Sequence, residues 1–470
     1  MLILSAVGCP PSNTGLTSHG ICLRAARPSS AGICPTFVLT DLNGGMMSKF
    51  SFGSRVLIAP VLIFQLGATA IAAETPLTLA AAVKQALEKN PEIQQLQHRV
   101  RGLEAKAKQA VYLDDPQIAF QVGGVPLSDP TGFNQADANS IGIRQMVPFF
   151  GKLGLKEKIA GGEKNIAEQE LRAKEREIIS MVKMAYADLF MADRSIEILR
   201  EQLEILRTVI GATEARYRVG RVTQQDVFKA QLEQSEVLNQ LIVAEEEITV
   251  ATVKLNTAMF RSPRTPIEIP NDLETDNSIQ NFSGLDDLAL ASRPELRGAQ
   301  QEIERAEVLY ELANRNRKYP DFMLGWDYMR MPTEMKKDRY AAMVNITIPF
   351  SPWTAGKRAY EVEESLAEIR AARSNREAIR NMTVKEVAQA EAKVGAAKRS
   401  LQLYREGLLS QAELSFRSAL AAYQTGRVEF VNLLEAQRAL RESRMGYYKA
   451  TASFVQNVAD LERAVGRDLQ

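Results

Sequence analysis

The sequence predicts a mainly α-helical protein with a small membrane β part, built from two copies of one module. Two observations carry this prediction. Short motifs recur in the same order in both halves of the chain, and each half combines long helical periodicity with a pair of alternating strands. Each copy is expected to contribute two strands and a long antiparallel helical hairpin. Four strands cannot close a membrane barrel alone, so the chain is expected to oligomerise.

The duplication is visible as four pairs of matching motifs. ALEKNPEI at Ala86 matches ALASRPEL at Ala289, DPQIAF matches YPDFML, QMVPF matches ITIPF, and YRVGRVTQQDVFKAQ matches YQTGRVEFVNLLEAQ. One such match arises easily by chance, but four in the same order indicate an internal repeat. We predict a first repeat over 74–262, a linker rich in proline and acidic residues over 263–284, and a second repeat over 285–470.

The residues before the first repeat have the pattern of an export signal. Basic residues precede an apolar run from Val56 to Leu66, and small residues follow it. We expect a signal peptide at 47–73 and interpret residues 1–46 as a start-site artefact or a disordered extension. A single transmembrane anchor is the alternative, and it is disfavoured because the run is shorter than the roughly 20 residues of a spanning helix.

Composition excludes several classes of function. The net charge is +1 over 470 residues, with no basic face, so no nucleic-acid partner is expected. The cysteines Cys9, Cys22 and Cys34 all precede the repeats, which therefore offer neither disulfides nor thiolates. The repeats contain one histidine, His98, expected on a helix surface. Without a phosphate-binding glycine loop, a metal-spaced cluster or a nucleophile elbow, we expect no cofactor and no enzymatic activity.

The later part of each repeat has the periodicity of a coiled coil. In the first copy, apolar residues follow steps of three and four from Leu171 to Ile210. This pattern predicts a helix from about Gly161 to Arg216, some 80 Å long at about 1.5 Å per residue. A turn at Gly220 precedes a second helix, and the second copy repeats the pattern. On the helices alone, a structural coiled-coil or adhesin-like rod is an equal alternative.

The strands favour a membrane protein over that rod. Apolar and more polar residues alternate in four runs of about 8 to 10 residues, the length of a tilted strand that crosses a bilayer. Polar loops, Gly124 to Ala138 and Met329 to Arg339, join the strands of each pair. A soluble sheet packed on a core would look the same locally, but the export signal and the loops favour lipid outside and water inside. We predict a homotrimer whose strands form a twelve-stranded barrel in outer-membrane lipid.

The chain after residue 74 resembles the TolC-type outer membrane efflux proteins in three features. These are the paired helix starts, the strand pairs closed by Pro148-Phe149 and Pro349-Phe350, and the twin Y-x-x-G-R turns. The segment RQMVPFFGKL, Arg144 to Leu153, is most similar to outer-membrane components of heavy-metal resistance-nodulation-division pumps. The resemblance implies a trimeric duct in the outer membrane of a Gram-negative bacterium, continued by a helical tunnel in the periplasm. It also implies a periplasmic adaptor protein, an inner-membrane pump, and export of metal cations or small toxic compounds.

The resemblance further implies a gate at the periplasmic tip of the tunnel. The gate and selectivity residues that it implies are Tyr217, Gly220, Asp226, Tyr423, Gly426, Arg427, Asn432 and Glu435. The second copy departs from the family pattern, because Asn432 stands where an aspartate is usual and Val428 holds the place of a bridging arginine. Three copies of Glu435 around a narrow axis would favour cations. The alternative is that Asp226 and Glu435 are ordinary solvated carboxylates.

A group of methionines is the remaining candidate for metal chemistry. Five of them cluster in the sequence around the second loop: Met323, Met329, Met331, Met335 and Met343. Because thioethers suit soft ions such as Cu(I) and Ag(I), we predict a metal site at Met329, Met331 and Met335. Methionine also fills packing gaps, which is the alternative interpretation.

Overall fold

The computed structural model describes residues 76–132, 136–268, 270, 272–273, 284–331 and 338–469. The expected signal peptide at 47–73 and the segment 1–46 lie outside these residues. Among the described residues, no helix has both the length and the apolar character required to span a membrane.

The same order of elements occurs twice along the chain. The first repeat contains α1 (Leu79–Lys89), α2 (Pro91–Gln109), β1 (Gln117–Gly123), β2 (Ala138–Val147), α3 (Lys152–Arg218) and α4 (Gln224–Ala258). The second contains α5 (Leu285–Ser292), α6 (Pro294–Lys318), β3 (Phe322–Arg330), β4 (Arg339–Ile346), α7 (Ala355–Leu403), a π-helical turn η2 (Tyr404–Leu408), α8 (Leu409–Gln424) and α9 (Phe430–Val465). The predicted duplication of helical hairpins and strand pairs is confirmed.

The kink before α2 and the kink before α6 are held in different ways. In the first repeat the Asn90 side chain accepts hydrogen bonds from the backbone N–H of Glu92 at 2.7 Å and of Ile93 at 3.3 Å. Asparagine is a favoured helix N-cap, and the following proline suits the first helical position. In the second repeat Arg293 stands in this place and its side chain forms no cap.

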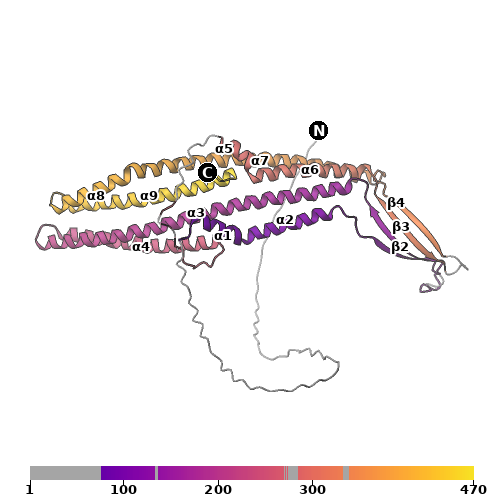
Figure 1. Cartoon of the computed structure of the whole chain (residues 1–470), viewed down its shortest axis with the longest axis horizontal. Helices are drawn as coiled ribbons and strands as arrows, with labels where there is room; N and C mark the ends of the chain where they lie inside the picture. Colours follow the sequence, from indigo (N-terminus) through magenta and orange to yellow (C-terminus); the bar gives the residue numbers. More distant parts are fainter. Residues whose placement is uncertain are drawn as a thin grey trace, which may run out of the picture. The chain divides into compact units, whose positions relative to one another are not determined.

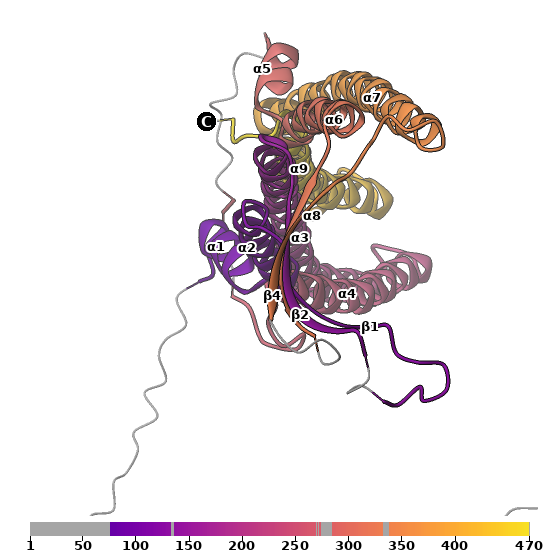
Figure 2. The same ribbon diagram turned by 90° about the vertical axis from the view of Figure 1, so that its right-hand side faces the viewer.

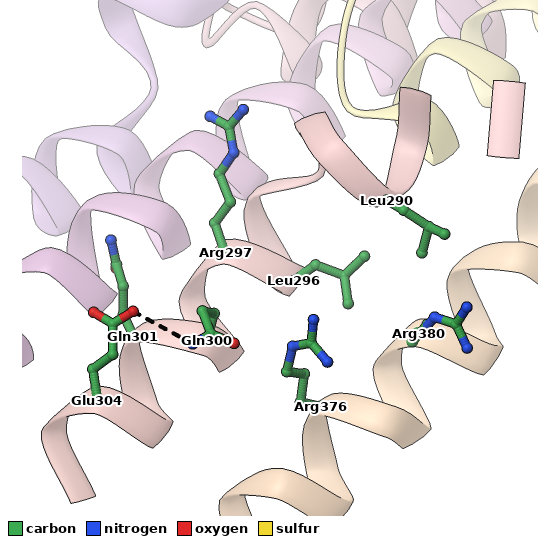
Figure 3. Close-up of a pocket in the computed structure, with 8 residues that line it drawn as sticks. All are labelled: Leu290, Leu296, Arg297, Gln300, Gln301, Glu304, Arg376 and Arg380. Atoms are coloured by element: carbon green, nitrogen blue, oxygen red, sulfur yellow. Dashed lines mark hydrogen bonds between the residues drawn. The ribbon is translucent and has the colours of Figure 1, made fainter. Parts of the chain in front are cut away.

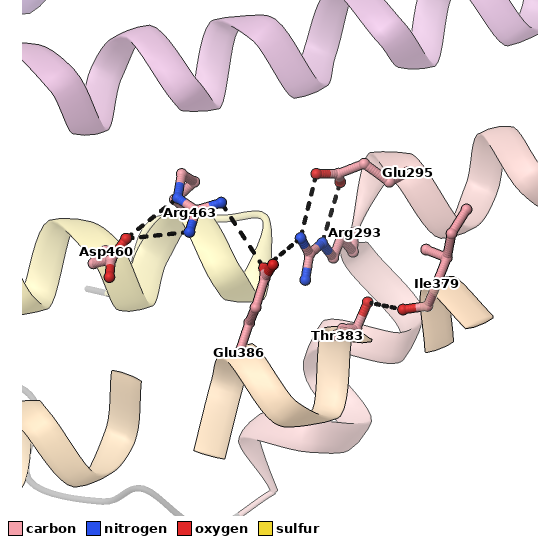
Figure 4. A network of polar contacts seen from close by, with 7 residues as sticks. All are labelled: Arg293, Glu295, Ile379, Thr383, Glu386, Asp460 and Arg463. Carbon is pink, nitrogen blue, oxygen red and sulfur yellow. Dashed lines mark hydrogen bonds and ion pairs between the residues drawn. The ribbon is translucent and has the colours of Figure 1, made fainter. Parts of the chain in front are cut away.

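Arg293 instead joins α6 to α7 through a buried ion pair. Its Nη2 lies 2.7 Å from Oε2 of Glu386 on α7, and only 5% of the residue is exposed. The same carboxylate lies 3.9 Å from Nη1 of Arg463 on α9, and Arg463 also pairs with Asp460 (Figure 4). At the start of its second helix, the first repeat therefore has a local side-chain cap, whereas the second repeat has an ion-pair network between helices.

Helix α3 is longer than its periodicity indicated. It begins at Lys152, so Gly161 and Gly162 lie inside the helix and the predicted start near Gly161 is wrong. At about 1.5 Å per residue it reaches roughly 100 Å. A Cβ on Gly162 would lie 3.2 Å from Cβ of Arg305 on α6. This glycine therefore allows close packing of α3 on α6 and does not mark a helix end.

The long helices run side by side, with the sheet at one end and the hairpin turns at the other (Figure 1). Helix α6 packs between α3 and α7 near the sheet, and α9 packs between the same two helices nearer the turns. Helices α2 and α4 pack on α3. Seen from the sheet end, the helices follow a curve that runs from α7 through α6 and α3 to α4 (Figure 2).

The core between these helices contains many small side chains. Alanines such as Ala82, Ala86, Ala185 and Ala251 are buried together with Phe190. Small residues let neighbouring helices approach closely. The described part of the predicted linker also joins this core, because Ile267 and Leu273 pack against it.

The four strands form one antiparallel sheet in the order β1-β2-β3-β4. Gly123 pairs with Ala138 and Met329 pairs with Arg339, so these residues belong to strands. The predicted loop boundaries were therefore too wide, because the alternation continues to the hairpin ends. One face carries exposed apolar side chains from all four strands, including Ile118, Phe120, Ile141, Ile143, Leu324, Trp326, Tyr340, Val344 and Ile346.

A buried cation joins the sheet to the helices. Lys152, 3% exposed, donates from Nζ to Oδ1 of Asp321 at 2.8 Å and to the carbonyl of Tyr319 at 3.1 Å. The same Asp321 oxygen accepts from the backbone N–H of Phe149, whose ring stacks on Tyr319 with centroids 4.4 Å apart. The residues that follow Pro148 therefore form the junction between β2, α3 and the start of β3.

A buried carboxylate joins the two helical hairpins. Glu233 on α4 is 0% exposed, and its Oε2 accepts from Nε of Arg438 on α9 at 2.7 Å. Its Oε1 accepts from Nη1 of Arg441 at 2.9 Å. The hydrogen bond to Glu233 raises the pKa of Arg438 above its ordinary value. Because an arginine with a raised pKa stays protonated at every physiological pH, titration of Arg438 cannot open this contact.

Glu233→Gln is expected to lower the free energy of unfolding by about 3 kcal/mol, because it leaves two cations without their buried partner. The matched control is Glu236→Gln, since Glu236 lies 3.4 Å from the same Arg438 but its side chain is 48% exposed. That change should cost less than about 1 kcal/mol. Denaturant unfolding of the purified protein checks both values, and equal stability of the two variants would contradict the assignment.

Candidate functional site

The two hairpin turns lie together at the end of the helices that is farthest from the sheet (Figure 1). Gly220 and Gly426 both have left-handed backbones, with φ of 70° and 74°. Nothing lies near the position of a Cβ at either glycine, so the backbone conformation alone requires glycine there. In both turns the residue after the glycine closes the helix end with a 2.9 Å hydrogen bond, Arg221 N–H to Arg216 and Arg427 N–H to Ala422.

Tyr423 connects the second hairpin to the first. It is 3% exposed, and its hydroxyl lies 3.2 Å from Oγ1 of Thr213 on α3. The guanidinium of Arg216 lies 4.4 Å from the centre of the Tyr423 ring, and its Nη2 donates to the carbonyl of Gln424 at 2.6 Å. The arginine is stabilised by the cation–π interaction with the ring and by the negative end of the helix dipole. We call Thr213, Arg216 and Tyr423 the tip contact.

The corresponding tyrosine of the first repeat has a different environment. Tyr217 is 45% exposed, whereas Tyr423 is buried with Phe430 in an apolar cluster. Val428, for which the resemblance predicted the place of a bridging arginine, packs against the same cluster. At the turns, the arginine that contacts the other hairpin is Arg216 of the first repeat. Sequence reasoning missed it because it lies on the opposite hairpin from the position that the family pattern indicates.

The predicted acidic residues, Asp226 and Glu435, form no bond to the described residues of the tip contact. Asp226 accepts from the backbone N–H of Thr223 at 3.1 Å and from its hydroxyl at 2.9 Å, so it caps the start of α4. Arg427, Asn432 and Glu435 are exposed, and none of their side chains bonds to another described residue. The structure therefore brings Tyr423 and Gln424 into contact with α3 and leaves Glu435 exposed on α9.

The second face of the sheet is polar. Asp327 is 7% exposed, and a Cβ on Gly142 would lie 1.7 Å from its Oδ1, so Asp327 lies across Gly142 of β2. Arg144 reaches over Gly325 of β3 in the same way, with its Cγ 3.4 Å from a Cβ placed on that glycine. Each glycine thus makes room for a charged side chain from the neighbouring strand.

Two of the three methionines predicted to hold a metal, Met329 and Met331, lie next to the second loop. Met329 lies on the polar face next to the loop, Met331 follows the end of β3, and Met335 lies outside the described residues. Met323 and Met343 lie toward the helices, and Met323 is about 20 Å from Met329 along its strand. His98 is exposed on α2, and no described group of histidine, cysteine or carboxylate residues could hold a metal ion.

A shallow pocket of about 490 Å³ lies between the start of α6 and α7 (Figure 3). Its lining residues are Leu290, Leu296, Arg297, Gln300, Gln301, Glu304, Arg376 and Arg380. Arg297 donates to the Ala291 carbonyl at 2.9 Å, and Arg376 pairs with Glu377 at 2.9 Å. Glu304 is the one carboxylate among these eight residues, and the others are arginines, glutamines and leucines.

Comparison with known proteins places the chain in a family. The model of the family described as "Outer membrane efflux protein" matches residues 82–259 and 285–467, one match in each repeat. The cobalt-zinc-cadmium resistance protein CzcC of Cupriavidus metallidurans is 21% identical over 400 residues, which cover 83% of this chain and 90% of that protein.

Solved structures share the fold. The structure of CusC has a TM-score of 0.71 at 18% identity and covers 83% of this chain and 92% of its own. The outer membrane protein VceC of Vibrio cholerae has a TM-score of 0.69 at 20% identity, with coverage of 83% and 97%. With both repeats matched and the helical hairpins and sheet in place, the chain belongs to the outer membrane efflux protein family, as its motifs predicted.

Proposed function

We propose that this chain is the trimeric exit duct of a tripartite efflux pump. The observation that carries the proposal is the sheet, which presents an exposed apolar face and has β1 and β4 as its edges. Lipid accepts an apolar face, but it cannot hydrogen-bond to the free backbone groups of a strand edge. Three chains joined edge to edge would pair every strand in a twelve-stranded barrel.

The helices support the same proposal. All of them lie at one end of the sheet, and α3 alone is roughly 100 Å long. When three chains are arranged around one axis, their strands form the barrel and their long helical hairpins continue its wall. The duct would receive its cargo from an inner-membrane pump of the resistance-nodulation-division type through a periplasmic adaptor protein.

Metal cations are the cargo class that the relatives favour. The name of CzcC assigns it to cobalt, zinc and cadmium resistance. The segment from Arg144 to Leu153 also resembles heavy-metal components. In the structure it contains Arg144 and Met146 on the polar face of the sheet and Lys152 at the buried junction. We therefore propose export of metal cations, with small toxic organic compounds as the other outcome of the test.

A strain that lacks this gene should become sensitive to zinc, cadmium, cobalt or silver salts and should regain resistance with the gene on a plasmid. Growth inhibition by each metal and by a panel of organic drugs separates the two cargo classes. The protein should fractionate with the outer membrane and migrate as a trimer until heated. Recovery of the protein as a soluble periplasmic monomer would contradict the proposed duct and favour the structural rod.

The tip contact is proposed to hold the tunnel closed. Arg216→Ala removes the guanidinium from the Tyr423 ring and from the Gln424 carbonyl. If the contact contributes about 1.4 kcal/mol, its loss shifts the closed-to-open ratio about tenfold toward open. Single-channel conductance in planar bilayers should therefore rise. Arg218→Ala is the control, because Arg218 is exposed on the same helix, and equal conductance of the two variants would remove Arg216 from the gate.

Glu435 is proposed to line the constriction as a ring of three carboxylates. Glu435→Gln should lower the ratio of cation to anion permeability, and Asn432→Asp, which adds a second acidic ring one helical turn away, should raise it. Reversal potentials in a salt gradient measure both changes. An unchanged ratio in Glu435→Gln would make this residue an ordinary solvated carboxylate.

A further inference from the structure

Three methionines lie together on the polar face of the sheet, at the end next to the helices. Met146 of β2 pairs with Met323 of β3, and Met323 pairs with Asn345 of β4. Met343 precedes Asn345 by two residues on β4. Because side chains alternate between the two faces of a strand, all four residues share one face. Met323 and Met343 belong to the methionine group noted in the sequence, but none of the three is among the metal ligands predicted there, Met329, Met331 and Met335.

The thioethers converge on a small area. Nδ2 of Asn345 lies 3.4 Å from Sδ of Met343 and 4.0 Å from Sδ of Met323. Met146 stands directly opposite Met323, and the Cβ atoms of such partners are about 5 Å apart. Methionine side chains are long enough to bring three sulfur atoms from three adjacent strands around one ion.

Packing does not account for these methionines. The apolar side chains of the sheet lie on its other face, and Met146 is 39% exposed. None of the three belongs to the described hydrophobic clusters of the helices. Their neighbours on the same face include the polar or charged Arg144, Asn345 and Asp327 and the small residue Gly325, and none of these is a large apolar side chain. A flexible apolar side chain in such surroundings gains little from burial, so its sulfur is the chemically distinctive part.

Thioether sulfur is a neutral, soft ligand. It prefers Cu(I) and Ag(I) to zinc or cobalt ions, for which imidazole and carboxylate are the better ligands. A thioether has no proton to lose, so the binding of a soft ion does not require deprotonation. Arg144 lies on the same face two residues from Met146, so selection would depend on the softness of the ligands and not on attraction by charge.

We propose that Met146, Met323 and Met343 form a binding site for Cu(I) or Ag(I) at the helix-side end of the barrel. The inference rests on the proposed duct, which makes the polar face the wall of the lumen. Three chains would place three such sites at one level, where an ion leaving the helical tunnel enters the barrel. Asp327 lies four residues further along β3, about 13 Å toward the outside, and supplies the next anionic group on the path.

The test is Ag(I) binding to the purified, detergent-solubilised full chain in chloride-free nitrate buffer, followed by calorimetry. Met323→Leu and Met343→Leu should each weaken silver binding by at least about tenfold, and the double variant should lose it. Leucine conserves the side-chain volume, so the sheet should stay folded. Met382→Leu, at an exposed methionine of α7, is the matched control and should bind silver like the parent. Excess Zn(II) should not displace the silver.

Silver-edge X-ray absorption identifies the ligands and should show sulfur neighbours that disappear in the double variant. Parent protein that binds no silver, or unchanged affinity in Met323→Leu and Met343→Leu, would overturn the site. If Met329→Leu lost silver binding and Met323→Leu kept it, the silver would bind at the loop, and the proposed site would also be overturned. Conductance in planar bilayers is measured in parallel, so a chain that conducts without binding silver refutes this site and leaves the duct intact.

Discussion

The outer backbone edges of β1 and β4 have no strand beside them within the described chain, and the sheet they bound has one apolar, exposed face. In lipid, each unsatisfied N–H or C=O group costs several kcal/mol, so this sheet is incomplete as a monomer in a membrane. The rest of the architecture follows from that constraint. Strand pairs come from both repeats, the helices leave the sheet at one end only, and Lys152 fixes the first long helix to the strands at a single buried junction.

The two repeats keep the same backbone plan but use different side chains at equivalent places. Asn90 caps α2 locally, whereas Arg293 binds Glu386 on another helix. Tyr217 is exposed at its turn, whereas Tyr423 is buried against the first hairpin. A protein whose repeats were identical would form the same contact between every neighbouring pair of hairpins. Because the repeats differ in sequence, the tip contact forms only where Tyr423 of a second-repeat hairpin meets Arg216 of a first-repeat hairpin. The two kinds of hairpin interface in the duct can therefore differ in strength.

Patterns with a fixed local period could be predicted from the sequence. The four strands, the glycine turns and the coiled-coil helices all follow from side-chain alternation, positive φ or apolar steps of three and four. The start of α3 was missed because Gly161 and Gly162 resemble a helix boundary, although Gly162 serves close packing on α6. The loops were drawn too wide because polar residues near the hairpin ends still pair in the sheet.

By itself, the sequence determined the family, the duplication and the alternation of each strand, because these depend on residues close together in the chain or repeated along it. Only the tertiary structure decided which residues from different elements meet. Arg216 reaches Tyr423 across two hairpins, and Glu233 meets Arg438 between α4 and α9. The register of β2 against β3 places Met146 opposite Met323. Such contacts depend on the register and packing of distant segments, which no local period specifies.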